Sequence, residues 1–587
     1  MAKKDTALTW DLSKLYTGLD DPQIEKDQKR ADSVVDAFVT RYAQSTTWLT
    51  NAKALAEALT EYEKLILVPG SNASYYAYYR KDLNTADKEA EALAARLDDR
   101  GTKRGNKLLF FGLKLGKVSK EKQAEFLASP KLAPFNYYLT QLFDNAQFDL
   151  SEPEERILSL KSDVSHSRWV QATSNILDKQ TVKWGTEELP LPKAEMSYNT
   201  LPTAKRRKLY GLVRDVYERV SDVAESELNA VYTNKKINDE LRGYKTPYEA
   251  TIRGYQNDEK AVMALVAAVT KHQDIAQRFY KVKAKLLKEK KLGYADRAAE
   301  VGKVRGDFSF AKARPFVQSV FNDLDPLFGD LYQRLTTSRQ VDVYPVKGKT
   351  GGAYCSSGST TPTLVLLNHT DSFDSVKTLG HEMGHAIHAE RSKMQRPFYQ
   401  GHTISVAETA STFFEYATMH RLTESLPKSQ QIIALHNMIQ DDVATVFRQI
   451  AFFRFEQKLH DAVRKDGYVP KDKIAALMNE EMAAYLGPAF KLDTKDGYFF
   501  VTIGHIRRFF YVYSYAYGQL ISKALHVELK KDKNFIKKVD QFLTAGESMS
   551  PEDIFGSIGL DTRSPKLFED GLASIAEDVQ KLEKLVQ

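Results

Sequence analysis

The chain has 587 residues, too many for one simple hydrophobic core, so two to four structural units are expected. Its 42% hydrophobic and 27% charged residues are typical of an ordinary soluble globular protein. The net charge of +7 is a small difference between 84 basic and 77 acidic side chains, and no basic stripe or recognition motif indicates nucleic-acid binding.

The N-terminal stretch "MAKKDTALTWDLSKLY" has three lysines but no apolar core, which argues against a secretory signal. The longest apolar runs, such as residues 262–269, are much shorter than the ~18 residues that a membrane span needs. Cys355 is the only cysteine, so an intrachain disulfide is excluded, in keeping with a reducing compartment. We therefore expect a cytoplasmic protein with no membrane contact.

Residues 1–200 are predicted to form helices almost throughout, because apolar residues recur at spacings of three and four. A β-hairpin is predicted at 181–192, where apolar and polar residues alternate around a glycine-containing turn. Helices resume at residue 203. Within them the lysine-rich run 281–291 is interpreted as the solvated face of a helix.

The second β signal covers residues 339–370. Two apolar segments in it, "VDVYPV" and "PTLVLLN", are predicted strands, and the glycine- and serine-rich stretch between them is predicted to be a loop. Helices follow to the C-terminus. The sequence thus indicates a mainly α protein with one small sheet directly before the most informative helix.

That helix contains "VKTLGHEMGHAIHAE", residues 376–390. Asp371 or Ser372 is expected to cap it. Its buried stripe is expected to consist of the following apolar residues: Phe373, Val376, Leu379, Met383 and Ile387.

His381 and His385 are one helical turn apart, so both imidazoles can point toward one zinc ion. Glu382 is offset by about 100° around the helix, which is the place of a base that takes a proton from a zinc-activated water. Gly380 and Gly384 each weaken the helix by about 1 kcal/mol relative to alanine, which predicts that another backbone approaches there. The alternative is an ordinary helix whose polar histidines are satisfied by neighbouring groups.

A catalytic zinc needs a third protein ligand, and Glu408 in the predicted helix 404–422 is the candidate. Glu415 or Ser411, on the same polar stripe, would then orient the ligands. The competing interpretation of this stripe is an exposed acidic face. His388 and His402 lie nearby in the sequence but are not expected to bind the metal.

The sequence resembles peptidase family M3, in particular its oligoendopeptidase F branch. The resemblance rests on "TLGHEMGHAIH", "VAETASTFFE", "GGAYCSSG", "GHIRRFFYVYSYAYG" and the "LTWDLSKLY" opening, which occur in the family's order across most of the chain. It implies a mainly α fold in which two helical halves flank a deep substrate channel, with a small β-sheet beside the zinc-binding helices. Residues 1–200 would form a helical lid domain and 201–587 the zinc metallopeptidase catalytic domain.

The resemblance also implies roles for individual residues, with one zinc ion per chain. His381, His385 and Glu408 would bind zinc, and Glu382 would act as general base and acid. Gly352 and Ala353 would bind the backbone of an extended peptide at a sheet edge. The family further places a histidine and tyrosines at the developing oxyanion.

His505 matches the position of that histidine. Tyr511 and Tyr515 are preferred over the equally spaced Tyr513 and Tyr517, one pair of which is expected in the core. Cys355 occupies a small-residue position of the family's loop, and its role stays open.

The expected function is zinc-dependent hydrolysis of internal bonds in short unfolded oligopeptides. A metallocarboxypeptidase of the helical type is the first alternative, and it would need Arg507 or Arg508 to bind the C-terminal carboxylate of the substrate. A non-catalytic helical scaffold is a second alternative, and a zinc aminopeptidase is disfavoured because its exopeptidase motif is absent. The oligomeric state stays open between monomer and homodimer.

Overall fold

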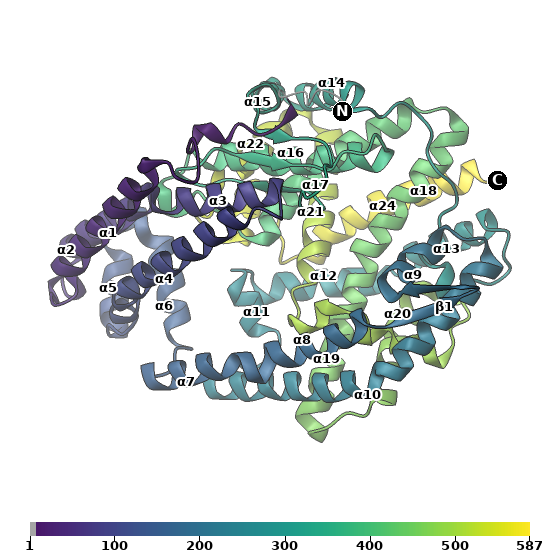
Figure 1. Cartoon of the computed structure of the whole chain (residues 1–587), viewed down its shortest axis with the longest axis horizontal. Coiled ribbons are helices and arrows are strands. Elements are labelled where there is room, and N and C mark those ends of the chain that lie inside the picture. Colours follow the sequence, from purple (N-terminus) through teal and green to yellow (C-terminus); the bar gives the residue numbers. More distant parts are fainter. Residues whose placement is uncertain (1–7) are drawn as a thin grey trace.

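The computed structural model describes residues 8–587 and is mainly helical, as predicted, with small sheets only (Figure 1). The first seven residues, which belong to the N-terminal stretch considered above, lie outside the described residues. Among the helices of residues 8–587, none is both long and apolar enough to cross a membrane.

The N-terminal third is helical. Its helices up to residue 146 carry their own hydrophobic clusters, whereas Val170, Ile176 and Leu177 pack against the large core described below. The helix bounds are α1 Pro22–Tyr42, α2 Ala52–Ile66, α3 Asn72–Leu83, α4 Lys88–Gly116, α5 Lys120–Ala128, α6 Asn136–Ala146, α7 Glu152–Ser162 and α8 Arg168–Asp178. One cluster joins Phe38, Leu55, Phe111 and Leu139 of α1, α2, α4 and α6. Side-chain caps define several starts; for example, Asn51 accepts hydrogen bonds from the amides of Lys53 and Ala54 at the start of α2.

The remaining helices pack around one large core that runs from residue 182 to residue 582. Before the sheet they are α9 Leu191–Ser197, α10 Thr203–Arg242, α11 Glu249–Gly254, α12 Glu259–Lys271, α13 Asp274–Leu286, α14 Phe310–Leu324 and α15 Pro326–Thr337. After it they are α16 Phe373–Ser392, α17 Ile404–Ser425, α18 Lys428–Thr445, α19 Phe447–Asp466, α20 Lys471–Leu486, α21 Tyr513–Lys531, α22 Ile536–Ala545, α23 Pro551–Ser557 and α24 Pro565–Leu585.

The predicted hairpin is confirmed as the antiparallel pair β1 Thr181–Trp184 and β2 Glu187–Pro190. Its buried residues Val182 and Leu189 belong to the large core rather than to the N-terminal clusters. The hairpin therefore packs with the C-terminal two-thirds of the chain.

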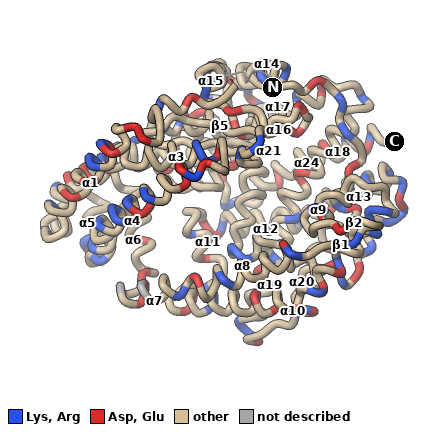
Figure 2. The backbone as a smooth tube through the Cα atoms, viewed as in Figure 1, with Lys and Arg blue, Asp and Glu red and all other residues tan. Residues whose placement is uncertain are grey.

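The expectation that the run 281–291 is wholly solvated is wrong at one residue. Lys283 of α13 is fully buried, and its ammonium donates hydrogen bonds to the carbonyl of Arg297, at 2.9 Å, and to the side-chain oxygen of Gln440. A charge count along the sequence could not reveal this, because both acceptors are distant in the chain. Elsewhere basic and acidic residues are interspersed along the helices (Figure 2).

The second sheet has the strand order β3-β5-β4, with β3 Val341–Asp342, β4 Tyr354–Ser356 and β5 Leu364–Leu366. The predicted strands are β3 and β5, which pair in parallel, whereas β4 lies in the stretch that its composition predicted to be a loop and that the family resemblance placed at a sheet edge. β4 pairs antiparallel with β5 on one side, so it forms an edge of this sheet. Its three residues are too few for an alternating pattern to emerge, which is why the sequence concealed it.

The opening segment "LTWDLSKLY" anchors this sheet. The indole nitrogen of Trp10 donates hydrogen bonds to the carbonyls of Val365 and Gln340, at 2.9 and 3.1 Å. Trp10 belongs to a cluster that also contains Leu364 and Leu366 of β5 together with residues of α1, α3 and α4. The N-terminal helices are thereby fixed against the sheet that lies beside α16.

Helix α16 begins after Ser372, one of the two predicted caps, whose side chain accepts a hydrogen bond from the amide of Ser375. The predicted apolar stripe is buried. Two glycines let α17 approach closely, as predicted: a Cβ on Gly384 would lie 2.9 Å from Ser411 Cα and 3.1 Å from its carbonyl oxygen, and one on Gly380 would lie 2.9 Å from Thr418 Oγ1. The spacing of these two helices sets the geometry of the site described below.

Replacing Gly384 with alanine should therefore lower the free energy of unfolding by roughly 1–3 kcal/mol, the usual cost of overpacking, because the contacted atoms are backbone and cannot move aside. Gly105 of α4 is the matched control: a Cβ there meets nothing within 4 Å, so Gly105→Ala should be neutral or stabilising by up to ~1 kcal/mol. Denaturant unfolding of both variants measures the difference. Equal stability of the two would contradict the tight α16–α17 contact.

Candidate metal centre

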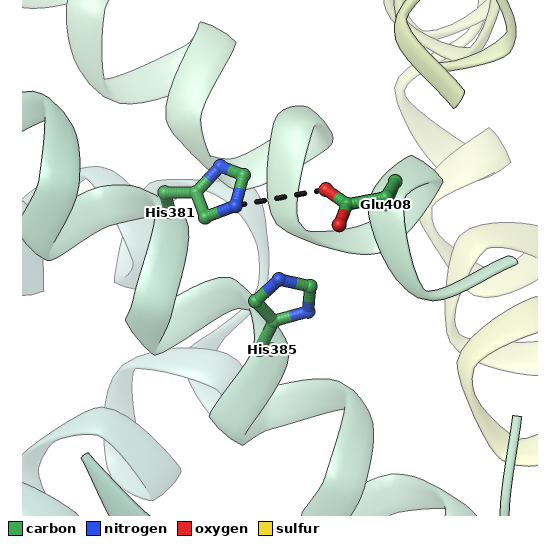
Figure 3. A group of neighbouring side chains, drawn as sticks. All are labelled: His381, His385 and Glu408. Atoms are coloured by element: carbon green, nitrogen blue, oxygen red, sulfur yellow. Dashed lines mark ion pairs between the residues drawn. The ribbon is translucent and has the colours of Figure 1, made fainter. Parts of the chain in front are cut away.

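The three predicted zinc ligands lie together between α16 and α17 (Figure 3). His381 and His385 project from successive turns of α16, and Glu408 faces them from α17. One potential ligand atom from each residue lies within 4.8 Å of the others, and His381 Nε2 is 3.7 Å from Glu408 Oε2. Among the side chains that the structure describes, this is the one cluster of histidine, cysteine and carboxylate groups with metal-binding spacing.

Two neighbours that the sequence offered as alternatives each contact one of these residues. Glu415 Oε2 lies 2.7 Å from His381 Nδ1, and Ser411 Oγ lies 3.3 Å from Glu408 Oε2. A hydrogen bond donated by Nδ1 to Glu415 leaves the lone pair of Nε2 directed at the centre of the cluster, as a metal-binding histidine requires. Ser411 is fully buried and Glu415 is about a quarter exposed, so the stripe is not the exposed acidic face of the competing interpretation.

The charges of the cluster favour a cation at its centre. Burial lowers the pKa of His381, but the hydrogen bond and charge of Glu415, with the charges of Glu382 and Glu408, outweigh it and raise the pKa to about 9. Burial, reinforced by the positive charge of His381, holds the pKa of His385 well below its usual value, which keeps this imidazole neutral. Burial raises the pKa of Glu408. Burial also acts to raise the pKa of Glu415, but the hydrogen bond to His381 outweighs it, so the pKa of Glu415 is lowered.

Glu382 is 7% exposed and is not part of the ligand cluster, in line with its predicted place beside the metal. Its Oε2 has no hydrogen-bond partner in the described part of the chain. Burial, opposed by the charge of His381 and aided by those of Glu408 and Glu415, raises its pKa to about 7. A buried carboxyl group with a free oxygen and such a pKa can accept and return a proton near neutral pH.

Cys355 lies on the edge strand β4, near Glu382. Burial, followed by the charge of Glu382, raises the pKa of the thiol far above its usual value. Because the thiolate is the reactive form, a raised pKa disfavours reaction of this cysteine near neutral pH.

The sequence left two tyrosine pairs open, and the structure separates them. Tyr513 and Tyr517 are fully buried, and the hydroxyl of Tyr513 donates a 2.9 Å hydrogen bond to Asn257 Oδ1. Tyr511 and Tyr515 instead form a ring cluster with His505, with centroids 5.4 Å (His505–Tyr511), 6.2 Å (His505–Tyr515) and 5.7 Å (Tyr511–Tyr515) apart. Tyr515 lines the same cavity as His381 and Glu408.

The segment that carries His505 and Tyr511 is held in a strained conformation by residues that sequence reasoning missed. Phe509 and Phe510 both have left-handed φ angles, +51° and +61°, which is uncommon for bulky side chains. The amide of Phe510 donates a 2.7 Å hydrogen bond to Glu456, a fully buried carboxyl whose pKa burial raises to about 8. No local pattern in the sequence signals this contact, because Glu456 lies on α19.

Arg507, in the same segment, is buried and donates paired hydrogen bonds to Glu227 of α10 at 2.8 and 3.0 Å. It is therefore committed to a structural ion pair and does not serve as a free cation for a substrate. This removes one of the two arginines that could bind the C-terminal carboxylate in the carboxypeptidase alternative; the other candidate, Arg508, is exposed.

A cavity of about 490 Å³ opens at the cluster between α16, α17, α18, α19 and α21. It is lined by His381, Glu408, Glu415, Tyr515 and several charged residues, among them Arg448, which the sequence gave no reason to single out. A second cavity of about 420 Å³ lies at the C-terminal end of α16, lined in part by Lys393, His402 and the loop 357–361 that follows β4.

The predicted substrate-binding residues Gly352 and Ala353 immediately precede β4 and are at least partly exposed. The carbonyl of Gly352 already accepts a 2.7 Å hydrogen bond from Asn368 Nδ2. The rings of His388 and His402 stack at 4.2 Å beside the site, and neither belongs to the ligand cluster.

Comparisons with known proteins point in one direction. The sequence profile described as "Peptidase family M3" matches residues 319–574, and one described as "Oligopeptidase F" matches residues 114–176. The chain is 25% identical to an oligoendopeptidase F homologue of Lactococcus lactis over 99% of this chain and 97% of that protein. It is 24% identical to the oligopeptidase PepF of Bacillus subtilis over 98% and 87%.

Solved structures share the fold. A crystal structure of a Chlamydophila abortus protein matches with a TM-score of 0.87 at 22% identity, covering 99% of this chain and 98% of that one. Oligoendopeptidase F from Enterococcus faecium matches with a TM-score of 0.68 at 20% identity, covering 96% and 97%. The helical architecture around the cluster is thus that of these proteins.

The different burial of Tyr513 and Tyr515 leads to a prediction about stability. Tyr513→Phe removes a buried hydrogen bond to Asn257 and should lower the free energy of unfolding by about 0.5–1.5 kcal/mol. Tyr515→Phe alters a partly exposed ring and should stay within about 0.5 kcal/mol of the parent. Chemical denaturation of the two variants distinguishes them, and the reverse order would mean that the wrong pair has been placed in the core.

Proposed function

Because the chain belongs to peptidase family M3, we propose that it is a zinc-dependent endopeptidase that hydrolyses internal bonds of short unfolded oligopeptides. The observation that carries the proposal is the meeting of His381, His385 and Glu408, with Glu415 bonded to the outer nitrogen of His381. The conclusion that the chain is a peptidase rests on the family, whereas zinc, the endo mode of cleavage and the residue roles are the proposal.

The residues fit a zinc ion. Two imidazoles and one carboxylate are the ligands of a well-known class of catalytic zinc sites, and three protein ligands leave a position for water or substrate. The neutral state of His385 leaves it a lone pair for the centre, and the Nδ1 bond of His381 to Glu415 leaves its Nε2 directed there, where a metal ion would replace the proton. Zinc bound there would supply a Lewis acid that polarises the scissile carbonyl and makes water acidic near neutral pH.

Glu382 is the general base and acid in this proposal. Its unpartnered Oε2 is available to take a proton from the attacking water and to return it to the leaving amine nitrogen. The position next to His381, on the adjoining face of α16, keeps the carboxylate close to the ligands without making it one of them.

His505, Tyr511 and Tyr515 are proposed to donate hydrogen bonds to the oxyanion that develops on the substrate. Burial raises the pKa of Tyr511 well above its usual value, so the phenol stays protonated and can donate. Burial and the positive charges of Arg448 and Arg508 lower the pKa of His505, which favours the neutral imidazole.

The edge strand β4 supports the proposed binding of an extended peptide, with Gly352 and Ala353 at its entry. Main-chain pairing of this kind accepts an unfolded chain and rejects a folded domain. We propose that residues 1–200, apart from the hairpin β1–β2 that packs into the large core, form a lid over the catalytic unit 201–587 and so restrict access further, which would confine the substrates to oligopeptides.

The proposal is tested by mapping the products of a mixed peptide pool by mass spectrometry. The parent protein loaded with zinc should cut peptides of roughly 5–20 residues internally, including peptides with a C-terminal amide, and Glu382→Gln should cut none while it retains about one zinc per chain. Exclusive removal of C-terminal residues would favour the carboxypeptidase alternative. Loss of zinc from Glu382→Gln would show that this residue has been given the wrong role.

The ligand set generates a separate prediction about metal affinity. Glu408→Ala leaves two imidazoles and should lower zinc affinity steeply, whereas Glu415→Ala removes only an orienting bond and should weaken affinity or activity by about 10–100-fold. Competition titration with a chelator measures both. If Glu415→Ala loses zinc and Glu408→Ala keeps it, the two roles are reversed.

A further inference from the structure

The cavity beside the candidate metal centre contains three cationic side chains besides His381, and they are not equally neutralised. Lys377 pairs with Asp441 at 2.6 Å, and Lys523 pairs with Asp442 at 2.9 Å. Arg448 lines the same cavity and forms no ion pair with any carboxylate whose side chain the structure describes. Among the described residues, Arg448 is therefore the cation of this cavity whose charge no carboxylate neutralises.

A second guanidinium lies close to Arg448 and is also unpaired. Arg297 forms no ion pair within the described residues, and its charge is near enough to lower the pKa of Arg448, although burial is the larger cause. The Nε atoms of both arginines are buried and have no hydrogen-bond partner among these residues. The acid next to Arg297 in sequence, Asp296, is already bonded to Arg206 and Arg207.

The groups around this pair are phenols rather than carboxylates. Tyr280, Tyr294 and Tyr485 are buried near both arginines, and the hydroxyl of Tyr294 has no hydrogen-bond partner in the described residues. Phenols can donate to an anion but do not neutralise a cation. Since buried charges in proteins are normally paired, two adjacent guanidiniums among phenols constitute a site of excess positive charge that an anion would stabilise.

The geometry points to a peptide carboxylate as that anion. We propose that Arg448, backed by the charge of Arg297, binds a carboxylate of the peptide whose scissile bond lies at the metal centre. The planar fork of an arginine matches a carboxylate with two parallel hydrogen bonds. Arg448 and the ligands His381 and Glu408 line one continuous cavity, so one peptide can reach both.

Two sources offer this chemistry, the C-terminus of a short peptide and an acidic side chain at a fixed position from the cleaved bond. Either would set which bond is presented to Glu382. The inference rests on the proposed function, because it concerns the substrate of the same site, and it deepens that function by naming a chemical feature of the substrate.

The first experiment uses the zinc-loaded full chain and one well-cleaved peptide that contains a single glutamate. Three forms are compared: the free acid, the C-terminal amide, and the amide in which glutamine replaces the glutamate. If the C-terminus is bound, amidation should lower kcat/KM by about 10–100-fold, in line with the strength of a charge-assisted pair. If the side chain is bound, the glutamate-to-glutamine change should cause that loss instead.

Variants of Arg448 test whether this residue causes the preference for the charged peptide. In Arg448→Gln the ratio of kcat/KM between the preferred and the neutral peptide should fall to about one, and Arg448→Lys should restore part of it. Lys465→Gln is the matched control, because Lys465 is an exposed cation on the same helix α19 and does not line the cavity. It should keep the ratio of the parent protein.

Equal kcat/KM for all three peptides in the parent protein would overturn the inference without any variant, and so would an equal loss on charged and neutral peptides in Arg448→Gln. If chloride changes kcat/KM equally for all peptides and Arg448→Gln abolishes that change, the site holds an inorganic anion rather than a peptide carboxylate. This result would also overturn the inference. Failure of the parent protein to cleave any of the peptides would instead count against the proposed function.

Discussion

The contact between α16 and α17 is the constraint on which the candidate site depends. Gly380 and Gly384 remove the side chains that would otherwise separate the two helices, and Ser411 and Thr418 occupy the space. Only at this separation does Glu408 reach the two imidazoles of α16 while Glu415, two turns later, reaches the outer nitrogen of His381. A third helix adds to the constraint, because a Cβ on Gly518 of α21 would lie 2.9 Å from Glu408 Cβ.

Different kinds of contact hold the segments that surround this pair of helices. The N-terminal helices are fixed by Trp10 to the sheet that borders α16, so the edge strand β4 and the candidate ligands share one frame. On the opposite side, the segment with His505 and Tyr511 is held by two buried acids, Glu227 and Glu456, from α10 and α19. The strain of two consecutive left-handed phenylalanines persists because these contacts over-determine the backbone.

The parts of the site that depend on the local spacing of residues could be predicted from the sequence. The four-residue interval of His381 and His385 and the polar stripe of Glu408, Ser411 and Glu415 are consequences of helical periodicity, so they could be predicted. Glu227, Glu456, Arg297 and Arg448 could not, because each acts through a contact between segments that lie far apart in the chain. The tyrosine pairs share the same spacing, and packing alone decides that Tyr513 and Tyr517 face the core. Strand β4 is too short to show a period, so only the family resemblance placed its segment at a sheet edge. The burial of Lys283 could not be predicted because it depends on Gln440 and on the backbone of Arg297.

The edge strand β4 has a consequence for the behaviour of many copies of this chain in a crowded solution. A strand with one unpaired side can recruit the edge of another copy as readily as it recruits a peptide, and such pairing is a common start of aggregation. Here the edge is only three residues long, and its flanks are covered: Tyr354 bonds to Asp82, and Ser356 lies 2.7 Å from the hydroxyl of Tyr79 on α3. The same brevity and cover that hid β4 in the sequence leave too little edge for a second sheet to extend, so the chain can keep an open strand without polymerising through it.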